Sequence, residues 1–182
     1  VKNFVLASSS EVYQKPNKIP TPEEVPLIVP KLSNPRFSYG GGKIICELLC
    51  QHFGKKFFKK MLIFRPHNIY GKDMGNKHVI PQLINRSKKT KKTKKLFIQG
   101  SGKETRSFTH ISDFIQAFDL IINKGKHLNV YNIGTSEEIS INRLTKLILG
   151  KLKIDSKIIK GKIRPGSTNR RLPNINKIEK LG

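Results

Sequence analysis

The stretch Tyr39-Gly40-Gly41-Gly42-Lys43 places a tyrosine and a lysine four residues apart where a helical pattern begins. Apolar residues then recur at positions 44, 45, 48, 49 and 53, which is the spacing of an amphipathic helix. Because residues four apart share one face of a helix, we expect the Lys43 ammonium beside the Tyr39 phenol. A nearby cation favours the phenolate and lowers the pKa of a tyrosine from its ordinary value of about 10. The spacing therefore predicts a tyrosine that can exchange a proton, although a loop tyrosine and a solvated lysine give the same spacing by chance.

The segment before this stretch is a short apolar run that ends in hydroxyl groups. Phe4-Val5-Leu6 is followed by Ala7-Ser8-Ser9-Ser10-Glu11-Val12-Tyr13, which predicts a buried strand that runs into a polar loop. Open α/β sheets bind their ligands at the carboxyl ends of their strands. The serines and Glu11 therefore stand where such a sheet carries its chemistry, and a serine-rich turn is the alternative.

Further motifs follow along the chain in a fixed order. They are Arg65-Pro66-His67-Asn68-Ile69-Tyr70-Gly71, Arg106-Ser107-Phe108-Thr109-His110-Ile111-Ser112-Asp113, Tyr131-Asn132-Ile133-Gly134 and Arg170-Arg171-Leu172-Pro173-Asn174-Ile175. Together with the serine loop and Tyr-x-x-x-Lys, this series resembles the extended short-chain dehydrogenase/reductase family. More closely, it is similar to the NAD-dependent nucleotide-sugar epimerase/dehydratase branch. The resemblance covers nearly the whole chain and is specific for the family rather than for one reaction.

Strand and helix patterns alternate along the sequence. Strands are expected over 1–7, 61–64, 96–98, 130–133 and 157–160, and helices over 39–53, 79–88, 113–123, 141–149 and 174–181. Ser112 or Asp113 is expected near the N-cap of the third helix, and Ser140 is expected to cap the fourth. The alternation predicts an α/β fold with parallel pairing. By resemblance, it is the C-terminal part of a Rossmann-type doubly wound parallel sheet plus a smaller mixed α/β substrate-binding region.

The resemblance also implies a domain organisation. Residues 1–75 are expected to form the second half of the NAD-binding domain, and residues 76–182 mainly the nucleotide-sugar-binding region with interleaved Rossmann elements. The glycine-rich turn that holds the cofactor pyrophosphate in this family is not in the sequence. Gly40 to Gly42 is not that turn, because it follows the serine loop. We therefore expect a fragment that lacks the N-terminal glycine-rich half.

The chain is strongly basic, with a formal net charge of +24. Such charge binds nucleic acid or anionic membranes in other proteins, but lysine is spread along this whole chain. The one dense run, Arg86 to Lys95, predicts a solvated loop. No aromatic residue interrupts it, and aromatic residues are what stack on single-stranded bases. We expect no specific nucleic acid and no membrane as partners.

Cys46 and Cys50 lie four residues apart on one predicted helix, away from any cluster of His or Cys. Zinc usually takes four nitrogen or sulfur ligands, so packed free thiols are expected rather than a metal site. Two cysteines without a disulfide framework suit a reducing compartment. No apolar run is long enough to span a membrane. These features predict a cytoplasmic protein without a bound metal.

The resemblance implies a reaction that begins with oxidation of a sugar hydroxyl, usually at C4, with the hydride passing to NAD. It implies Tyr39 as the base and Lys43 as the residue that lowers its pKa and holds the nicotinamide ribose. Ser9 is the implied hydroxyl that shares the proton. The cofactor side of the site is implied to hold Ser8, Pro66 and His67.

Glu11 bears on the type of reaction. In dehydratases of this branch, an acid at this place removes a proton beside the new ketone, and a carboxylate has the strength for that step. Decarboxylases that act on UDP-glucuronate carry a similar Thr-Ser-Glu, and some epimerases keep the glutamate. The reaction type therefore stays open, and a salt bridge at the end of a strand is the alternative for Glu11.

The implied substrate is a nucleotide-diphosphate sugar. A diphosphate needs cations and amides, and a guanidinium fits it through paired hydrogen bonds. By resemblance, the substrate-binding residues are Ser10, Asn68, His78, Arg106 and Arg171. His110 is expected to be a packed histidine at a strand end.

The function implied by the resemblance is an NAD-dependent nucleotide-sugar epimerase/dehydratase, an isomerase or lyase that works as a homodimer. The 4-epimerase, 4,6-dehydratase and UDP-glucuronate decarboxylase types all remain open. A catalytically silent relative that binds NAD or nucleic acid is the alternative. The presence of Ser9, Tyr39 and Lys43 together favours the enzyme.

Overall fold

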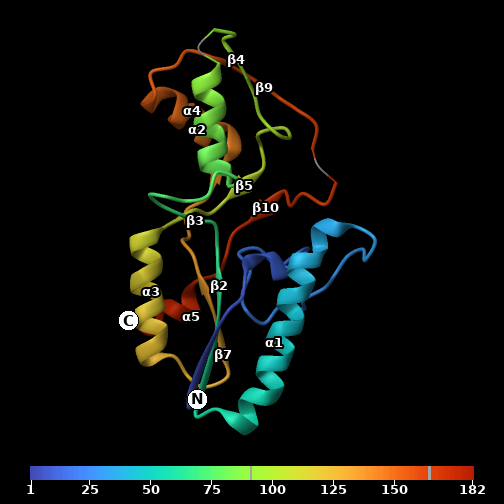
Figure 1. The fold of residues 1–182 in the computed structure, drawn as a ribbon, viewed down its shortest axis with the longest axis vertical. Helices are drawn as coiled ribbons and strands as arrows, with labels where there is room; N and C mark the ends of the chain where they lie inside the picture. Colours follow the sequence, from blue (N-terminus) through green and yellow to red (C-terminus); the bar gives the residue numbers. More distant parts are fainter. Residues whose placement is uncertain (91, 164) are drawn as a thin grey trace. The chain divides into compact units, whose positions relative to one another are not determined.

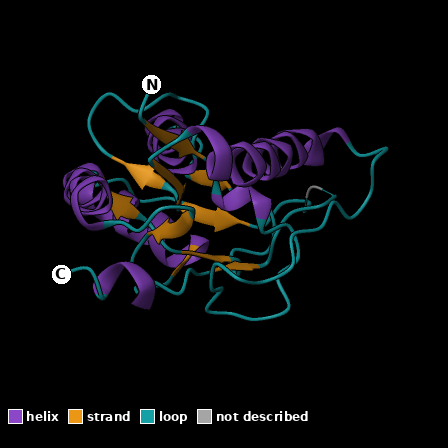
Figure 2. Ribbon diagram, turned by 90° about the horizontal axis from the view of Figure 1, so that it is seen from below, coloured by secondary structure: helices purple, strands orange, loops and turns teal. Residues whose placement is uncertain are grey.

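The computed structural model describes every residue except Lys91 and Arg164. The chain divides into two compact units, each built from separate segments. Unit 1 comprises Val1–Ile69, Ser107–Glu137 and Arg171–Gly182, and unit 2 comprises Tyr70–Arg106 and Glu138–Arg170. Figure 2 shows helices and short strands joined by loops.

Unit 1 is built on a parallel sheet in the order β1-β2-β7, whose strands are Asn3–Ala7, Lys60–Pro66 and Asn129–Ile133 (Figure 1). Ala7 pairs with Phe64 and Pro66 pairs with Ile133, so the three strands end at the same edge. The central strand β2 is buried from Met61 to Arg65. A strand buried on both faces is typical of parallel sheets covered by helices. The α/β prediction with parallel pairing is confirmed.

Helices cover both faces of this sheet, with α1 (Ser38–Phe57) on one side and α3 (Ile111–Lys124) on the other (Figure 1). The α3 side holds the main core of unit 1, in which Phe64 packs edge-on against Phe118 with ring centroids 5.2 Å apart. Each large apolar side chain buried there contributes about 1.5–3 kcal/mol. The rest of this core comprises Leu62, Ile121, Tyr131, Ile133 and Ile178, the last from the short helix α5 (Asn176–Glu179).

The orientation of α1 differs from the amphipathic prediction. The helix begins at Ser38, so all three glycines lie inside its first turns, and its buried residues are Gly40, Glu47 and Gly54. A Cβ at Gly40 would lie 2.6 Å from the Glu11 carbonyl oxygen, so this close approach requires glycine. The predicted apolar stripe is instead exposed at Ile45, Leu48, Leu49 and Phe53. Glycine contacts set which face of α1 meets the sheet, and apolar periodicity alone does not reveal them.

The helix caps agree only in part with the sequence. Ser140 caps α4 (Ile141–Lys151) as predicted, through a bond of 3.2 Å from the Arg143 N–H. Ser112 and Asp113 lie in the first turn of α3, near its N-cap as predicted, and the cap itself is His110, whose Nδ1 accepts from the Ser112 N–H at 3.3 Å. His110 ends the strand Thr109–His110, but it is exposed rather than packed as predicted.

Unit 2 packs α2 (Val79–Lys89) against α4, with Leu83, Ile98 and Ile148 in its core. Its strands form short pairs, β4 parallel to β9 and β5 antiparallel to β8. The bounds of these strands are Lys95–Phe97, Lys157–Ile159, Thr105–Arg106 and Ile139–Ser140. The remaining short elements are the 3₁₀ helices Ser10–Val12 and Pro35–Phe37 and the strands β3 (Ile69–Tyr70), β6 (Thr109–His110) and β10 (Arg170–Arg171).

Candidate functional site

Tyr39 and Lys43 lie on one face of α1 in unit 1, next to the carboxyl end of β1. The Lys43 Nζ donates to the Ala7 carbonyl at 2.8 Å and lies 5.9 Å from the centre of the Tyr39 ring. The Tyr39 side chain is 56% exposed. A cation within about 6 Å of a ring is attracted to it, so Lys43 holds its charge close to the phenol. The structure therefore brings together the tyrosine, the lysine and the end of the strand.

Ser9 lies two residues after Ala7 and caps the 3₁₀ helix Ser10–Val12. Its hydroxyl oxygen accepts from the Glu11 N–H at 3.1 Å. A hydroxyl has two lone pairs and one proton, so this bond leaves the proton to donate elsewhere. Ser9 thus combines a fixed position with a hydroxyl proton suited to a ligand oxygen.

Glu11 forms an ion pair with Arg171, and both guanidinium NH2 groups reach its carboxylate. The Arg171 side chain is buried and that of Glu11 is partly exposed. Glu11, the predicted base, and Arg171, the predicted phosphate-binding residue, therefore form an ion pair with each other. This pairing matches the alternative for Glu11, a salt bridge at the end of a strand, and its role as a base stays a prediction.

A buried polar network beneath the serine loop was not predicted. Arg65, at the end of β2, donates to Glu47 through Nε at 2.9 Å and through an NH2 group at 2.6 Å. Their side chains are only 4% and 7% exposed. Ser8 also donates its hydroxyl to Glu47. Glu47 therefore ties α1 to the ends of β1 and β2, and its position one helical turn after Lys43 was the signal in the sequence.

The network continues from Arg65 to Tyr13 and Asn132. Arg65 donates to the Tyr13 hydroxyl at 2.6 Å, and that hydroxyl donates to Asn132 Oδ1 at 2.9 Å. Burial raises the pKa of Tyr13 to about 12 despite the nearby Arg65 charge. The Asn132 amide in turn donates to the carbonyls of Thr21 and Asn174. Tyr13 is thus a neutral structural phenol, in contrast to the exposed Tyr39.

The predicted cofactor role of His67 stays a prediction, and its side chain is fully buried. Its Nε2 lies 3.4 Å from Asn132 Oδ1. Burial, helped by the positive charge of Arg171, lowers the pKa of His67 to about 3. His67 is therefore a neutral packed imidazole. Of the other residues predicted on the cofactor side, Ser8 is buried with its hydroxyl engaged by Glu47, and Pro66 is half-buried.

The predicted substrate residues are divided between the units. In unit 1, Ser10 is buried, and Asn68 has a positive φ of 40° while its amide donates to the Ser107 carbonyl at 2.8 Å. In unit 2, His78 is the exposed N-cap residue of α2. The Arg106 guanidinium donates to the Thr168 carbonyl at 2.7 Å. Arg106 and His78 remain more accessible candidates than Ser10.

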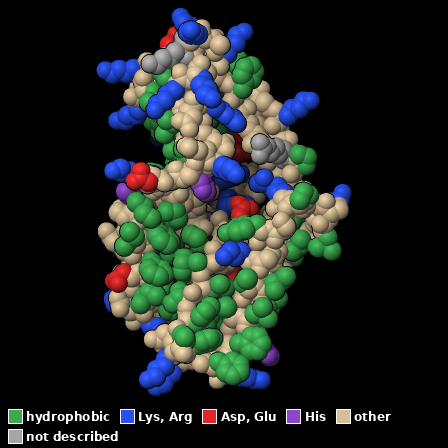
Figure 3. Space-filling model, in the orientation of Figure 1, with side chains coloured by type: hydrophobic (Ala, Val, Ile, Leu, Met, Phe, Trp, Pro, Cys, Tyr) green, Lys and Arg blue, Asp and Glu red, His purple; other side chains and the backbone are tan. Residues whose placement is uncertain are grey.

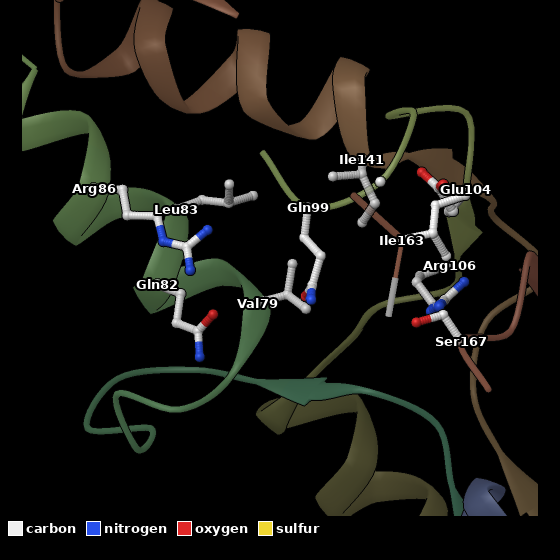
Figure 4. A pocket seen from close by; sticks show the side chains of 11 residues that line it. Val79, Gln82, Leu83, Arg86, Gln99, Glu104, Arg106, Ile141, Ile163 and Ser167 are labelled. Carbon is white, nitrogen blue, oxygen red and sulfur yellow. The ribbon is translucent and has the colours of Figure 1, made fainter. Parts of the chain in front are cut away.

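A pocket of about 110 Å³ lies within unit 2 (Figure 4). Arg86 and Gln82 project from α2 on one side and Arg106 and Ser167 lie on the other, with Gln99 between them. Its other lining residues are Val79, Leu83, Gly100, Glu104, Ile141 and Ile163. Apolar walls with a few polar groups are typical of a small-molecule pocket, and here two guanidinium groups and the Glu104 carboxylate supply the charge.

A glycine turn shapes one wall of this pocket. Gly100 and Gly102 have φ values of +79° and +80°, which residues with a side chain rarely adopt. The Glu104 carboxylate accepts from the N–H groups of Ser101 at 2.9 Å and Gly102 at 2.8 Å. Although burial raises the pKa of Glu104, these bonds bring it below its ordinary value. The turn therefore holds a charged Glu104 in a fixed place.

The described residues contain neither a membrane-spanning helix nor a cluster of metal-binding side chains. None of their helices is long and apolar enough to cross a bilayer. They contain no group of three or more His, Cys, Asp or Glu that could hold a metal ion. Both cysteines are free, but Cys46 is exposed rather than packed, and burial raises the pKa of the Cys50 thiol.

A parallel sheet with helices on both faces and a Tyr-x-x-x-Lys pair at its carboxyl edge define a Rossmann-type α/β protein of the dehydrogenase/reductase class. Residues 1–134 match the model of the NAD dependent epimerase/dehydratase family. The chain therefore belongs to this family, whose cofactor is NAD, and both predictions are confirmed at that level.

The chain is similar to several characterised members of the family. It is 35% identical over 158 residues to the dTDP-D-glucose 4,6-dehydratase of Dictyostelium discoideum, which covers 82% of this chain and 35% of that protein. It superimposes with a TM-score of 0.84 on a double mutant of DesIV, a dTDP-glucose 4,6-dehydratase from Streptomyces venezuelae solved with NAD, at 24% identity over 99% of this chain and 53% of that one.

A UDP-N-acetylglucosamine 4-epimerase from Methanobrevibacter ruminantium matches as well, with a TM-score of 0.85, 24% identity, and coverage of 100% of this chain and 57% of that one. The two solved structures show the fold alone. The chain spans about a third to somewhat over half of these relatives. The comparisons therefore establish the family and not one reaction.

Proposed function

We propose that this chain carries the acid/base groups of an NAD-dependent nucleotide-sugar epimerase/dehydratase that oxidises a sugar hydroxyl at C4. The observation that carries the proposal is the placement of Tyr39 and Lys43, on one helix face, beside the end of β1 that leads into Ser9. The Tyr39 phenol takes the proton of the sugar hydroxyl. The Lys43 ammonium, held by the Ala7 carbonyl, stabilises the phenolate electrostatically. The Ser9 hydroxyl donates to the same sugar oxygen.

The residues around Tyr39 fit a bound NAD. Tyr39 is exposed, and a Cβ built on Gly42 would meet no atom within 4 Å, so this side of α1 has free space. Tyr39 and Lys43 are the residues of this chain that would hold the nicotinamide ribose. When bound, NAD supplies the hydride acceptor for the oxidation.

The proposed substrate is a nucleotide-diphosphate sugar. In unit 2, Arg86 and Arg106 of the pocket are cations that match a phosphate group. In unit 1, Arg171 is the guanidinium that the resemblance assigns to the diphosphate. When a phosphate competes for Arg171, the Glu11 carboxylate is released from its ion pair.

Glu11 and the dTDP-D-glucose 4,6-dehydratase relative favour dehydration among the possible reactions. A released Glu11 is the carboxylate that would remove the proton beside a C4 ketone. Epimerisation and decarboxylation remain the other candidates. A catalytically silent relative is disfavoured by the arrangement of Tyr39 with Lys43 at the end of β1.

The exposed apolar face of α1 supports the proposed homodimer. Ile45, Leu48, Leu49 and Phe53 are all exposed on this helix, and Figure 3 shows hydrophobic side chains gathered over unit 1. A contiguous apolar patch on a helix marks a protein–protein contact. We expect Leu48→Glu to shift the complete protein from dimer to monomer in analytical ultracentrifugation, and an unchanged dimer would place the contact elsewhere.

Product analysis tests the proposed reaction. The complete protein is incubated with NAD and UDP-, dTDP- and GDP-sugars, and the products are identified by NMR. A 4,6-dehydratase gives a 4-keto-6-deoxy sugar, and in Glu11→Gln that product is lost. Products identical in wild type and Glu11→Gln would exclude Glu11 as the base, and no product with any sugar would favour the silent alternative.

A further inference from the structure

The positive charge of the chain is concentrated in unit 2. This unit holds 20 of the 36 Lys and Arg residues but only 4 of the 12 Asp and Glu residues. Figure 3 shows Lys and Arg side chains spread over its surface with few acidic neighbours. A uniform bias toward lysine would distribute the charge evenly over both units. The smaller unit instead carries more than half of the cationic residues, and we sought a structural reason for that excess.

The outer face of the β4–β9 pair carries part of this charge. Lys95 and Phe97 are exposed on β4, while Leu96 between them points into the core. Lys157 of β9 is the register partner of Lys95 and is also exposed. Like charges directly opposite each other weaken a strand pair. An anion bound between the two lysines would remove that repulsion.

An open hollow of about 770 Å³ adjoins this strand pair. Its walls are Lys89 and Thr90 at the end of α2, Thr93 in the following turn, and Lys95 and Phe97 of β4, together with Arg86 and Leu96. The Phe97 side chain is 60% exposed. Phe97 is the exposed large hydrophobic residue among the described residues that line the hollow. The other lining residues include Lys and Arg side chains and the hydroxyls of Thr90 and Thr93.

We propose that this face binds single-stranded nucleic acid without sequence preference. Sequence-independent binding of single strands combines cations that follow the phosphates with an aromatic ring on which a base stacks. Lys89, Lys95 and Lys157 provide the cations, and Phe97 provides the ring. Phe97 lies two residues beyond the basic run, and the fold adds Lys157 from far along the chain by pairing it with Lys95.

The chemistry of the face favours nucleic acid over other polyanions. An acidic peptide has charge but gains nothing specific from an exposed ring. A membrane surface calls for a broader apolar face than one phenylalanine. A single strand offers phosphates and unpaired bases together, and matches both features of the face.

Fluorescence anisotropy with the complete protein and a labelled oligouridylate of about 12 nucleotides tests the proposal. Phe97→Leu keeps an apolar side chain but removes the ring, and we expect it to weaken binding roughly 5- to 150-fold. Three neutralised phosphates predict a log–log salt slope of about −2, or about a 20-fold loss between 50 and 200 mM salt. Lys95→Ala and Lys157→Ala should each reduce the magnitude of that slope by about 0.7.

Matched controls lie on α1 in unit 1, where Phe57 and Lys55 are also exposed. Phe57→Leu and Lys55→Ala should bind the oligonucleotide like the wild type. Wild-type affinity in Phe97→Leu would overturn the proposal. Equal binding of heparin, or of phosphatidylserine vesicles, with no effect of Phe97→Leu would show a general polyanion or membrane surface and would overturn it as well.

Discussion

Replacing Glu47 by glutamine tests the physical basis of the network beneath the serine loop. Arg65 and Glu47 are joined by two hydrogen bonds of 2.9 and 2.6 Å and are almost fully buried. Glu47→Gln leaves the Arg65 charge buried with a neutral partner. Removing one member of a buried pair costs about 3–5 kcal/mol. Because glutamine still offers one acceptor oxygen, we expect a loss near the lower end, about 3 kcal/mol.

Urea unfolding of the complete protein measures this loss as a lower transition midpoint at an unchanged m-value. The matched control is Glu24→Gln, whose partner Lys177 lies 3.4 Å away in an exposed pair. Exposed pairs contribute about 0–1 kcal/mol, so this variant should unfold nearly like the wild type. Replacing both charges, as Glu47→Leu with Arg65→Met, should recover much of the stability. A Glu47→Gln loss below about 1 kcal/mol would refute the reasoning.

Three other outcomes are expected. Arg106→Ala should raise KM more than it lowers kcat, because it acts on a group remote from the reacting carbon, and steady-state kinetics with unchanged KM would contradict this. Arg171→Ala should raise KM likewise, and should also alter the acid limb of the pH–rate profile because Glu11 loses its ion partner. Burial lowers the pKa of His67 to about 3, so the neutral form stabilises the fold above the unfolded pKa of about 6.5, and that stability is lost as pH falls toward 3. The loss of up to about 1.4 kcal/mol per pH unit should be absent in His67→Gln, as urea titrations at pH 6.5 and 5 can measure.

The sequence predicts the strands and the Tyr39–Lys43 pair well, because both depend on local spacing. It predicts the orientation of α1 wrongly, since Gly40 and Gly54, not the apolar stripe, make the contacts with the sheet. Glycine contacts depend on the tertiary approach of two backbones, which periodicity does not encode.

In the candidate site, too, features set by local sequence could be predicted and features set by tertiary contacts could not. Ser9 and Tyr39 could be named from their motifs, whereas the pairing of Glu11 with Arg171 joins residues far apart in the chain. His67 belongs to a motif that suggested a ligand, yet the fold buries it completely. Burial and long-range ion pairing are properties of the folded chain, so residue type alone could not separate a ligand contact from a packed group.

The central claim is that Tyr39 is the proton acceptor, and Tyr39→Phe in the complete protein tests it most directly. Because Tyr39 is exposed and phenylalanine keeps its ring, we expect unchanged unfolding and retained NAD binding. Turnover of the accepted nucleotide sugar should fall by about 10²- to 10⁴-fold, the usual contribution of a positioned acid/base group. Turnover at the wild-type rate in a folded, NAD-binding Tyr39→Phe protein would contradict the assignment.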